Sequence, residues 1–147
     1  MTYRKKFPIM YNMNITYEHY EKIQKASSIL REENDCSVIA LAVASGKSYE
    51  EVHSLFTYFG RLNGKGVKLD TIKNVAHQLH LRLDPILVKN TTTNQFIKWI
   101  ACKRNEKYLL LTRGHIATVV NGTLMDWRKQ NSRARVWNAW KISNIEA

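Results

Sequence analysis

Apolar residues in the first two-thirds of the chain recur at three- and four-residue steps, which is the period of an amphipathic helix. The pattern predicts helices over residues 16–30, 36–45, 49–59, 69–79 and about 94–102. The second of these segments is apolar on nearly every side, so we expect it to lie buried. Residues 1–15 lack this period, and we expect an irregular or extended segment there, with Thr16 capping the first helix.

Local signals mark where several of these helices begin and end. Gly46 follows the buried segment and is typical of a helix C-cap. Ser48 and Glu51 have the spacing of a capping box, which predicts that the third helix begins at about residue 49. Three glycines between positions 60 and 66 predict a loop before the fourth helix.

Strand patterns dominate the last third of the chain. Predicted strands cover residues 108–112, 115–120, 123–127 and 136–142, and a short strand covers 81–83. Pro85 confines the segment after that short strand to a sheet edge or a turn. Asn121-Gly122 is a strong hairpin signal between two of the strands. Helices followed by strands predict an α+β fold with an antiparallel sheet.

Length and composition limit the class of protein. We expect the 147 residues to form a single domain, 1–147, with no linker. Hydrophobic residues make up 44% and charged residues 24%, which excludes wholesale disorder. No apolar run approaches the roughly 18 residues of a membrane span, and no signal peptide is recognisable. Two cysteines, Cys36 and Cys102, are too few for a disulfide framework and favour a reduced, cytoplasmic location.

The chain is strongly basic, with 23 Lys and Arg residues against 12 Asp and Glu residues and a formal net charge of +11. Such a charge permits an anionic partner, such as nucleic acid or an acidic protein, and it also favours solubility. Residues 127–141 interleave tryptophans with Arg and Lys, a mixture that can stack on and neutralise a nucleic-acid strand. The same mixture fits tryptophans that close a small core while basic side chains stay solvated, so both interpretations remain open.

Cys36 lies where the polar turn Asn34-Asp35 meets the buried helical segment. A buried cysteine often serves only as a small hydrophobic residue. The first turn of a helix argues for another role, because its free amides and the helix macrodipole stabilise a thiolate. We therefore interpret Cys36 as a candidate nucleophile whose thiol ionises below its ordinary pKa.

His115 and Asp126 lie on the two arms of the predicted hairpin. A two-residue turn at 121–122 pairs Ala117 with Asp126 and His115 with Arg128. His115 and Asp126 then project from the same face as diagonal neighbours. An aspartate in that position accepts from an imidazole N–H and leaves the other ring nitrogen for the thiol. Taken separately, each residue also fits a plain surface position.

Two further polar residues precede the cysteine. The side-chain amide of Asn34 is a candidate donor to a developing oxyanion, together with the backbone amide of Cys36. The alternative is that Asn34 is only a turn residue before a helix. Asp35 is interpreted as a cap or turn residue. Cys102 lies at the polar end of its helix without such partners, and we interpret it as incidental.

These residues resemble the papain-like cysteine hydrolases, in which the nucleophile heads a buried helix and the His and an Asp or Asn lie on adjacent strands. Residues 34–127, from Asn34-Asp35-Cys36 to the block between Gly114 and Asp126, are similar to small uncharacterised papain-like proteins often encoded by bacteriophages and bacteria. Papain itself has a glutamine several residues before the cysteine, whereas the nearby amide here is Asn34, two residues before it.

The resemblance implies a papain-like fold, with the nucleophile helix packed on the antiparallel sheet. It implies cysteine peptidase, isopeptidase or amidase chemistry on a peptide or protein substrate, carried by Cys36, His115 and Asp126. No metal or cofactor is expected, and a phage-encoded protein would act in the host cytoplasm. A second hypothesis keeps the papain-like shell but leaves the triad idle, with the basic surface binding nucleic acid or an acidic partner. Neither hypothesis specifies an oligomeric state.

Overall fold

The computed structural model describes residues 7–103, 105–126 and 133–145. Among these residues the chain forms five helices and five strands. In chain order they are α1 (Phe7–Ile29), α2 (Cys36–Ser45), α3 (Tyr49–Tyr58), α4 (Leu69–Gln78), β1 (Leu81–Ile86), α5 (Thr93–Trp99), β2 (Lys107–Thr112), β3 (His115–Val120), β4 (Thr123–Met125) and β5 (Asn138–Asn144). The strands form one antiparallel sheet in the order β1-β5-β2-β3-β4, so the predicted α+β class is confirmed.

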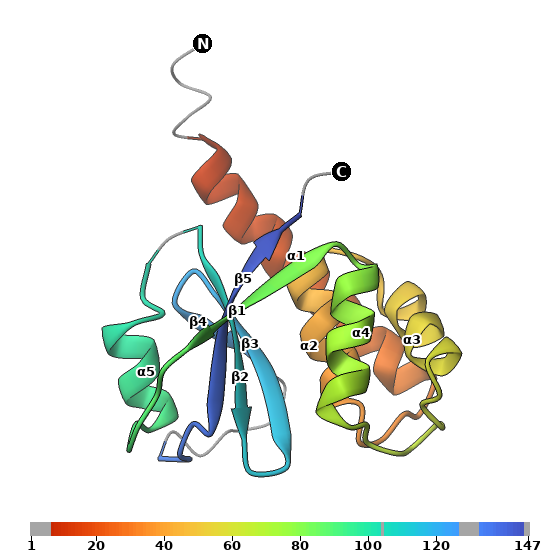
Figure 1. Ribbon diagram of the computed structural model, residues 1–147. Helices are drawn as coiled ribbons and strands as arrows, with labels where there is room; N and C mark the ends of the chain where they lie inside the picture. The colour runs from red at the N-terminus through yellow and green to blue at the C-terminus, as the bar shows by residue number, and fades with distance from the viewer. Residues whose placement is uncertain (1–6, 104, 127–132, 146–147) are drawn as a thin grey trace.

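The sheet lies between two helical layers of unequal size. α2 to α4 lie on one side of it and α5 on the other (Figure 1). On the larger side, Phe56 of α3 belongs to the same core as Leu109 and Trp140 of the sheet. On the smaller side, Phe96 of α5 packs with Tyr108. Successive residues of a strand point to opposite faces, which is why neighbouring β2 residues enter different cores.

α2 is the central helix of the larger layer, and residues 37–44 within it are buried, as its largely apolar sequence predicts. Side chains from the sheet form hydrogen bonds to its backbone. Thr118 Oγ1 donates to the carbonyl of Ala40 at 2.7 Å, and Lys107 Nζ donates to the carbonyl of Ala44 at 2.9 Å. A cation near a helix C-terminus also interacts favourably with the macrodipole. These contacts hold α2, and with it Cys36 at its first turn, against β2 and β3.

The helix boundaries agree with their local signals. Gly46 ends α2 in the left-handed region, at φ 74°, and Ser48 accepts from the backbone amide of Glu51 at the start of α3. The strand β1 runs through Pro85 at the edge of the sheet, the position that its missing N–H allows. α5 is shorter than predicted and ends at Trp99.

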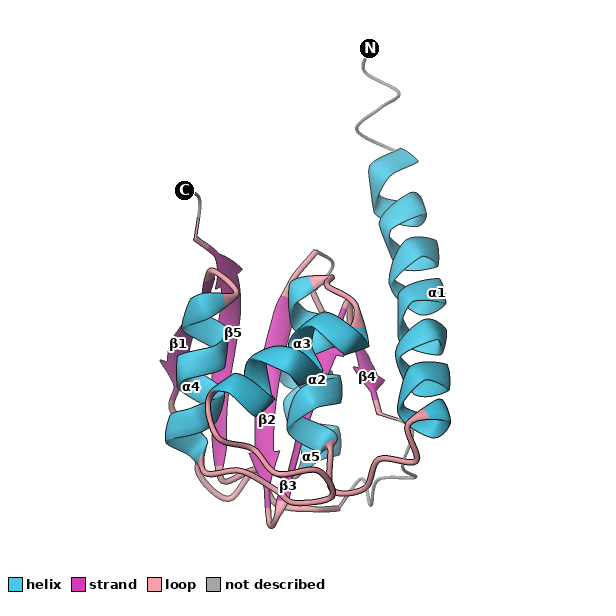
Figure 2. Ribbon diagram, turned by 90° about the vertical axis from the view of Figure 1, so that its right-hand side faces the viewer, coloured by secondary structure: helices cyan, strands magenta, loops and turns pink. Residues whose placement is uncertain are grey.

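The N-terminal prediction is wrong over residues 7–15. α1 begins at Phe7, and Thr16 lies inside the helix instead of capping it. Pro8 falls in the first turn, where a helix tolerates proline, and neither glycine nor another proline interrupts the segment up to Ile29. The first half of α1 projects beyond the other elements (Figure 2). An amphipathic period reflects packing on a core, and a helical segment that projects beyond the other elements need not carry one.

No helix in the part of the chain that the structure describes is both long and apolar enough to span a bilayer.

Candidate active site

Cys36 is the first residue of α2 and lies partly buried in a cleft of about 470 Å³. The cleft is lined by residues 32–36, Gly66, Gly114 and His115. Three separate segments therefore meet at the thiol: the turn before α2, the loop between α3 and α4, and the turn between β2 and β3.

The β3–β4 hairpin brings His115 and Asp126 together. Its ladder pairs Thr118 with Met125, which is the register that the Asn121-Gly122 turn predicts. Asp126 follows β4 directly, and its Oδ2 lies 2.6 Å from Nε2 of His115. Both side chains are almost inaccessible to solvent, at 9% and 4%. The expected pair of His115 with Arg128 falls outside the described residues.

The electrostatics of His115 favour a protonated ring. Burial lowers the pKa of the imidazole, but the hydrogen bond to Asp126 and the interaction with Cys36 outweigh it and raise the pKa to about 9. Nε2 of the ring forms the hydrogen bond to Asp126. Nδ1 is buried and has no hydrogen-bond partner within normal distance and angle limits among the described residues. Cys36 is the other charged neighbour of the ring, so a thiolate and an imidazolium stabilise each other here.

The thiol of Cys36 responds in the opposite direction. Burial raises its pKa, whereas His115 and the backbone amides of Ile116 and Ser37 lower it, and the net result is a pKa below the ordinary value. The amide of Ser37 belongs to the helix start, as the sequence predicts. The amide of Ile116 was missed, because no local signal tells which strand amide will face the start of a distant helix.

Asp35 occupies the N-cap position of α2 but makes no capping hydrogen bond with its side chain, so its interpretation as a cap is wrong in that respect. Its carboxylate is buried, and Oδ2 accepts from Ser27 at 2.6 Å and from Tyr49 at 2.8 Å. This oxygen therefore accepts from the hydroxyls of Ser27 in α1 and Tyr49 in α3, and not from the amides at the start of α2. Asp35, which immediately precedes the nucleophile, is thereby bonded to both helices.

Asn34 lines the cleft, as expected of an oxyanion donor, with its backbone in the left-handed region at φ 54°. Its Nδ2 donates to the carbonyl of Gly64 at 2.9 Å. A side-chain amide carries two N–H donors, so one of them is committed to Gly64 and its role toward an oxyanion stays a prediction. Cys102 is exposed and is not among the residues lining the cleft.

The chemical capacity of the site follows from these contacts. A thiolate can attack a carbonyl carbon, and the adjacent imidazolium can protonate the leaving group. Within the described residues there is no group of three or more His, Cys, Asp and Glu side chains that could hold a metal ion.

Comparison of this chain with protein-family models, with curated proteins and with solved structures found no match.

Proposed function

We propose that the chain is a papain-like cysteine hydrolase that cleaves a peptide, isopeptide or related amide bond. The observation that carries the proposal is the position of His115, which lies between the thiol of Cys36 and the carboxylate of Asp126. A structural cysteine needs neither a lowered pKa nor a histidine held by a buried carboxylate. Perturbed pKa values that cluster in a cleft are typical of catalytic groups.

The proposed reaction proceeds through an acyl-enzyme. The Cys36 thiolate attacks the carbonyl carbon, and the carbonyl oxygen becomes an oxyanion that the backbone amide of Cys36 stabilises, with Asn34 as the second candidate donor. His115 then gives its proton to the leaving amine as the C–N bond breaks. Water, deprotonated by His115, attacks the thioester and releases the acid. Asp126 holds the ring in the orientation that both steps need.

An acyl-enzyme trap tests this proposal. We expect p-nitrophenyl acetate to transfer its acetyl group to Cys36 with a burst of p-nitrophenolate, because the lowered pKa of Cys36 increases the fraction of thiolate. Intact-mass analysis and peptide mapping give the modified residue. Cys36→Ser should lose the burst and Cys102→Ala should keep it. Acetylation confined to Cys102, or absent from both cysteines, would contradict the proposal.

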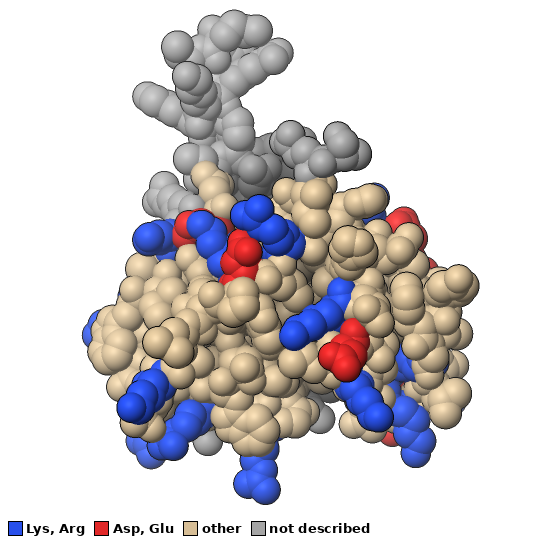
Figure 3. Space-filling view, viewed as in Figure 1, with Lys and Arg blue, Asp and Glu red and all other residues tan. Residues whose placement is uncertain are grey.

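The alternative is a binding protein with an idle triad, motivated by the +11 charge. Arg133 and Arg135 are exposed and Trp137 is 54% exposed, as a nucleic-acid contact requires, whereas Trp140 is buried in the core. Residues 127–132 of this basic stretch lie outside the described residues. On the face seen in Figure 3, Lys and Arg are dispersed, mostly toward the margin, with acidic side chains among them. That face shows no gathered basic patch.

A gel-shift titration separates the two functions. If residues 127–141 bind nucleic acid, replacing Arg133 and Arg135 by Glu is expected to weaken binding and to reduce its dependence on salt concentration. The same change should leave the alkylation of Cys36 unaltered, because neither arginine lines its cleft. Absence of a shift at micromolar protein and low salt would assign the charge to a protein partner, an acidic substrate or solubility.

A further inference from the structure

A buried acid–base cluster lies next to the cleft and outside the proposed triad. Its centre is Glu32, whose side chain is 4% exposed. Oε2 of Glu32 accepts from Nη1 of Arg61 at 3.1 Å and lies 2.6 Å from Nε2 of His53, while Oε1 accepts from the backbone amide of Gly64 at 2.6 Å. Burial raises the pKa of Glu32, but these hydrogen bonds outweigh it and lower the pKa to about 2. The carboxylate therefore stays ionised over the pH range in which a thiolate acts.

The cluster connects two of the segments that line the cleft. Gly64 is held through both of its polar backbone groups, since Glu32 accepts from its N–H and Asn34 donates to its carbonyl. Its φ of 78° lies in the left-handed region, which glycine adopts without strain. Arg61, with a side chain that is 0% exposed, adds a hydrogen bond of 3.2 Å to the carbonyl of Glu33. Asn34 is thus restrained at its side chain and at the preceding peptide group.

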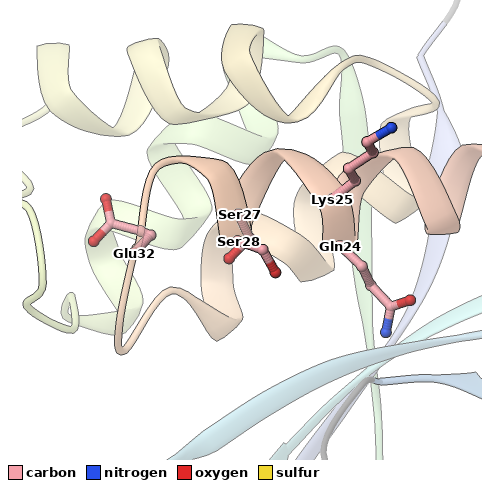
Figure 4. A pocket seen from close by; sticks show the side chains of 5 residues that line it. All are labelled: Gln24, Lys25, Ser27, Ser28 and Glu32. Atoms are coloured by element: carbon pink, nitrogen blue, oxygen red, sulfur yellow. The ribbon is translucent and has the colours of Figure 1, made fainter.

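Glu32 also borders a hollow beside α1, but its carboxylate does not point toward the other side chains that line this hollow. Figure 4 shows it on the loop that follows the helix, pointing away from Gln24 and Ser28. The side chains around that hollow do not converge on a common point. The interactions of the Glu32 carboxylate are accordingly those with Arg61, His53 and the backbone beside Asn34.

We propose that Glu32 is a positioning residue of this site: by holding Gly64, it orients the side-chain amide of Asn34 so that the second N–H donates to the oxyanion. The inference rests on the proposed function, because it concerns the same reaction. A planar amide with one N–H fixed on Gly64 has its second N–H direction fixed as well. A donor held before the reaction begins stabilises the transition state without a cost of reorganisation.

Two small probes isolate the oxyanion step. With p-nitrophenyl acetate, the sulfur of Cys36 attacks the ester carbon, the carbonyl electrons move to oxygen, and collapse expels p-nitrophenolate to leave an acetyl thioester. With iodoacetamide, the sulfur displaces iodide from a saturated carbon, and no oxyanion forms. A residue that acts through the oxyanion therefore affects acetylation alone, whereas a residue that acts on the thiolate or the fold affects both reactions.

The experiment compares Glu32→Gln, Asn34→Gly, their double variant and the wild-type protein, with Glu21→Gln on the exposed face of α1 as the matched control. Glycine keeps the left-handed backbone at position 34 unstrained. We expect each single variant to slow acetylation by about tenfold or more and to change iodoacetamide alkylation by less than about twofold. The double variant should lose no more than Asn34→Gly alone, because the two residues act as one unit.

Equal losses in acetylation and alkylation for Glu32→Gln, or additive losses in the double variant, would overturn the proposal. If Glu32→Gln does not fold, His53→Phe replaces it, because phenylalanine keeps a ring at this half-buried position and removes one donor from Glu32. Unchanged acetylation in that variant counts against the proposal. Failure of the proposed function looks different: the wild-type Cys36 would then not be acetylated at all.

Discussion

Replacing His115 by alanine is expected to move the pH midpoint of Cys36 alkylation from below the ordinary thiol pKa to above it. In the wild-type protein, His115 and the amides of Ile116 and Ser37 lower the pKa of Cys36 against the effect of burial. Without the imidazolium, burial, the largest of these influences, is opposed only by the two amides. The thiolate fraction at about pH 6 should fall about tenfold or more, and the rate of alkylation should fall with it.

The measurement is the iodoacetamide rate constant as a function of pH, made in a Cys102→Ala background so that only Cys36 reports. The wild-type rate should rise through the lowered pKa of Cys36 and then level off while His115 remains protonated, up to about pH 9. His77→Ala removes an exposed histidine of α4 and is the matched control. An ordinary wild-type midpoint that His115→Ala does not change would refute Cys36 as the nucleophile.

Asp126→Ala is expected to slow acetyl transfer to Cys36 by about a hundredfold to ten-thousandfold, the range typical of a lost orienting carboxylate. Asp126 and Cys36 together raise the pKa of His115 to about 9 against the effect of burial, so the loss of Asp126 should lower that pKa. A smaller fraction of the ring is then protonated at neutral pH, and its stabilisation of the thiolate weakens. Alanine also removes the acceptor at Nε2 that fixes the orientation and the tautomer of the ring.

Two readouts decide this prediction: the rate of p-nitrophenolate release and the NMR titration of the His115 ring. Asp84→Ala serves as the control, because that carboxylate forms an exposed ion pair with Arg82, a kind of pair that contributes little. A titration midpoint that stays near pH 9 in Asp126→Ala would show that the 2.6 Å contact does not set the charge of His115, and the triad would reduce to a dyad.

Several features of the site follow from the sequence alone because their causes are local. The extent of α2 follows from a largely apolar run between the Asn34-Asp35 turn and Gly46. The pairing of β3 with β4 follows from the Asn121-Gly122 turn, and that register is what places Asp126 against His115. A cap or a tight turn acts over a few residues, so the residues that cause it lie next to the structure they produce.

Other features depend on contacts between segments far apart in the chain, and only the tertiary structure decided them. Insertion of β5 between β1 and β2, the approach of the Ile116 amide to the thiol, and the enclosure of Glu32 by Arg61 and His53 have no local signature. Asp35 accepts from the hydroxyls of two neighbouring helices instead of capping the helix it precedes. Such outcomes depend on which surfaces pack together. A buried polar group needs a hydrogen-bond partner, and the fold determines which backbone or side-chain groups lie close enough to provide one.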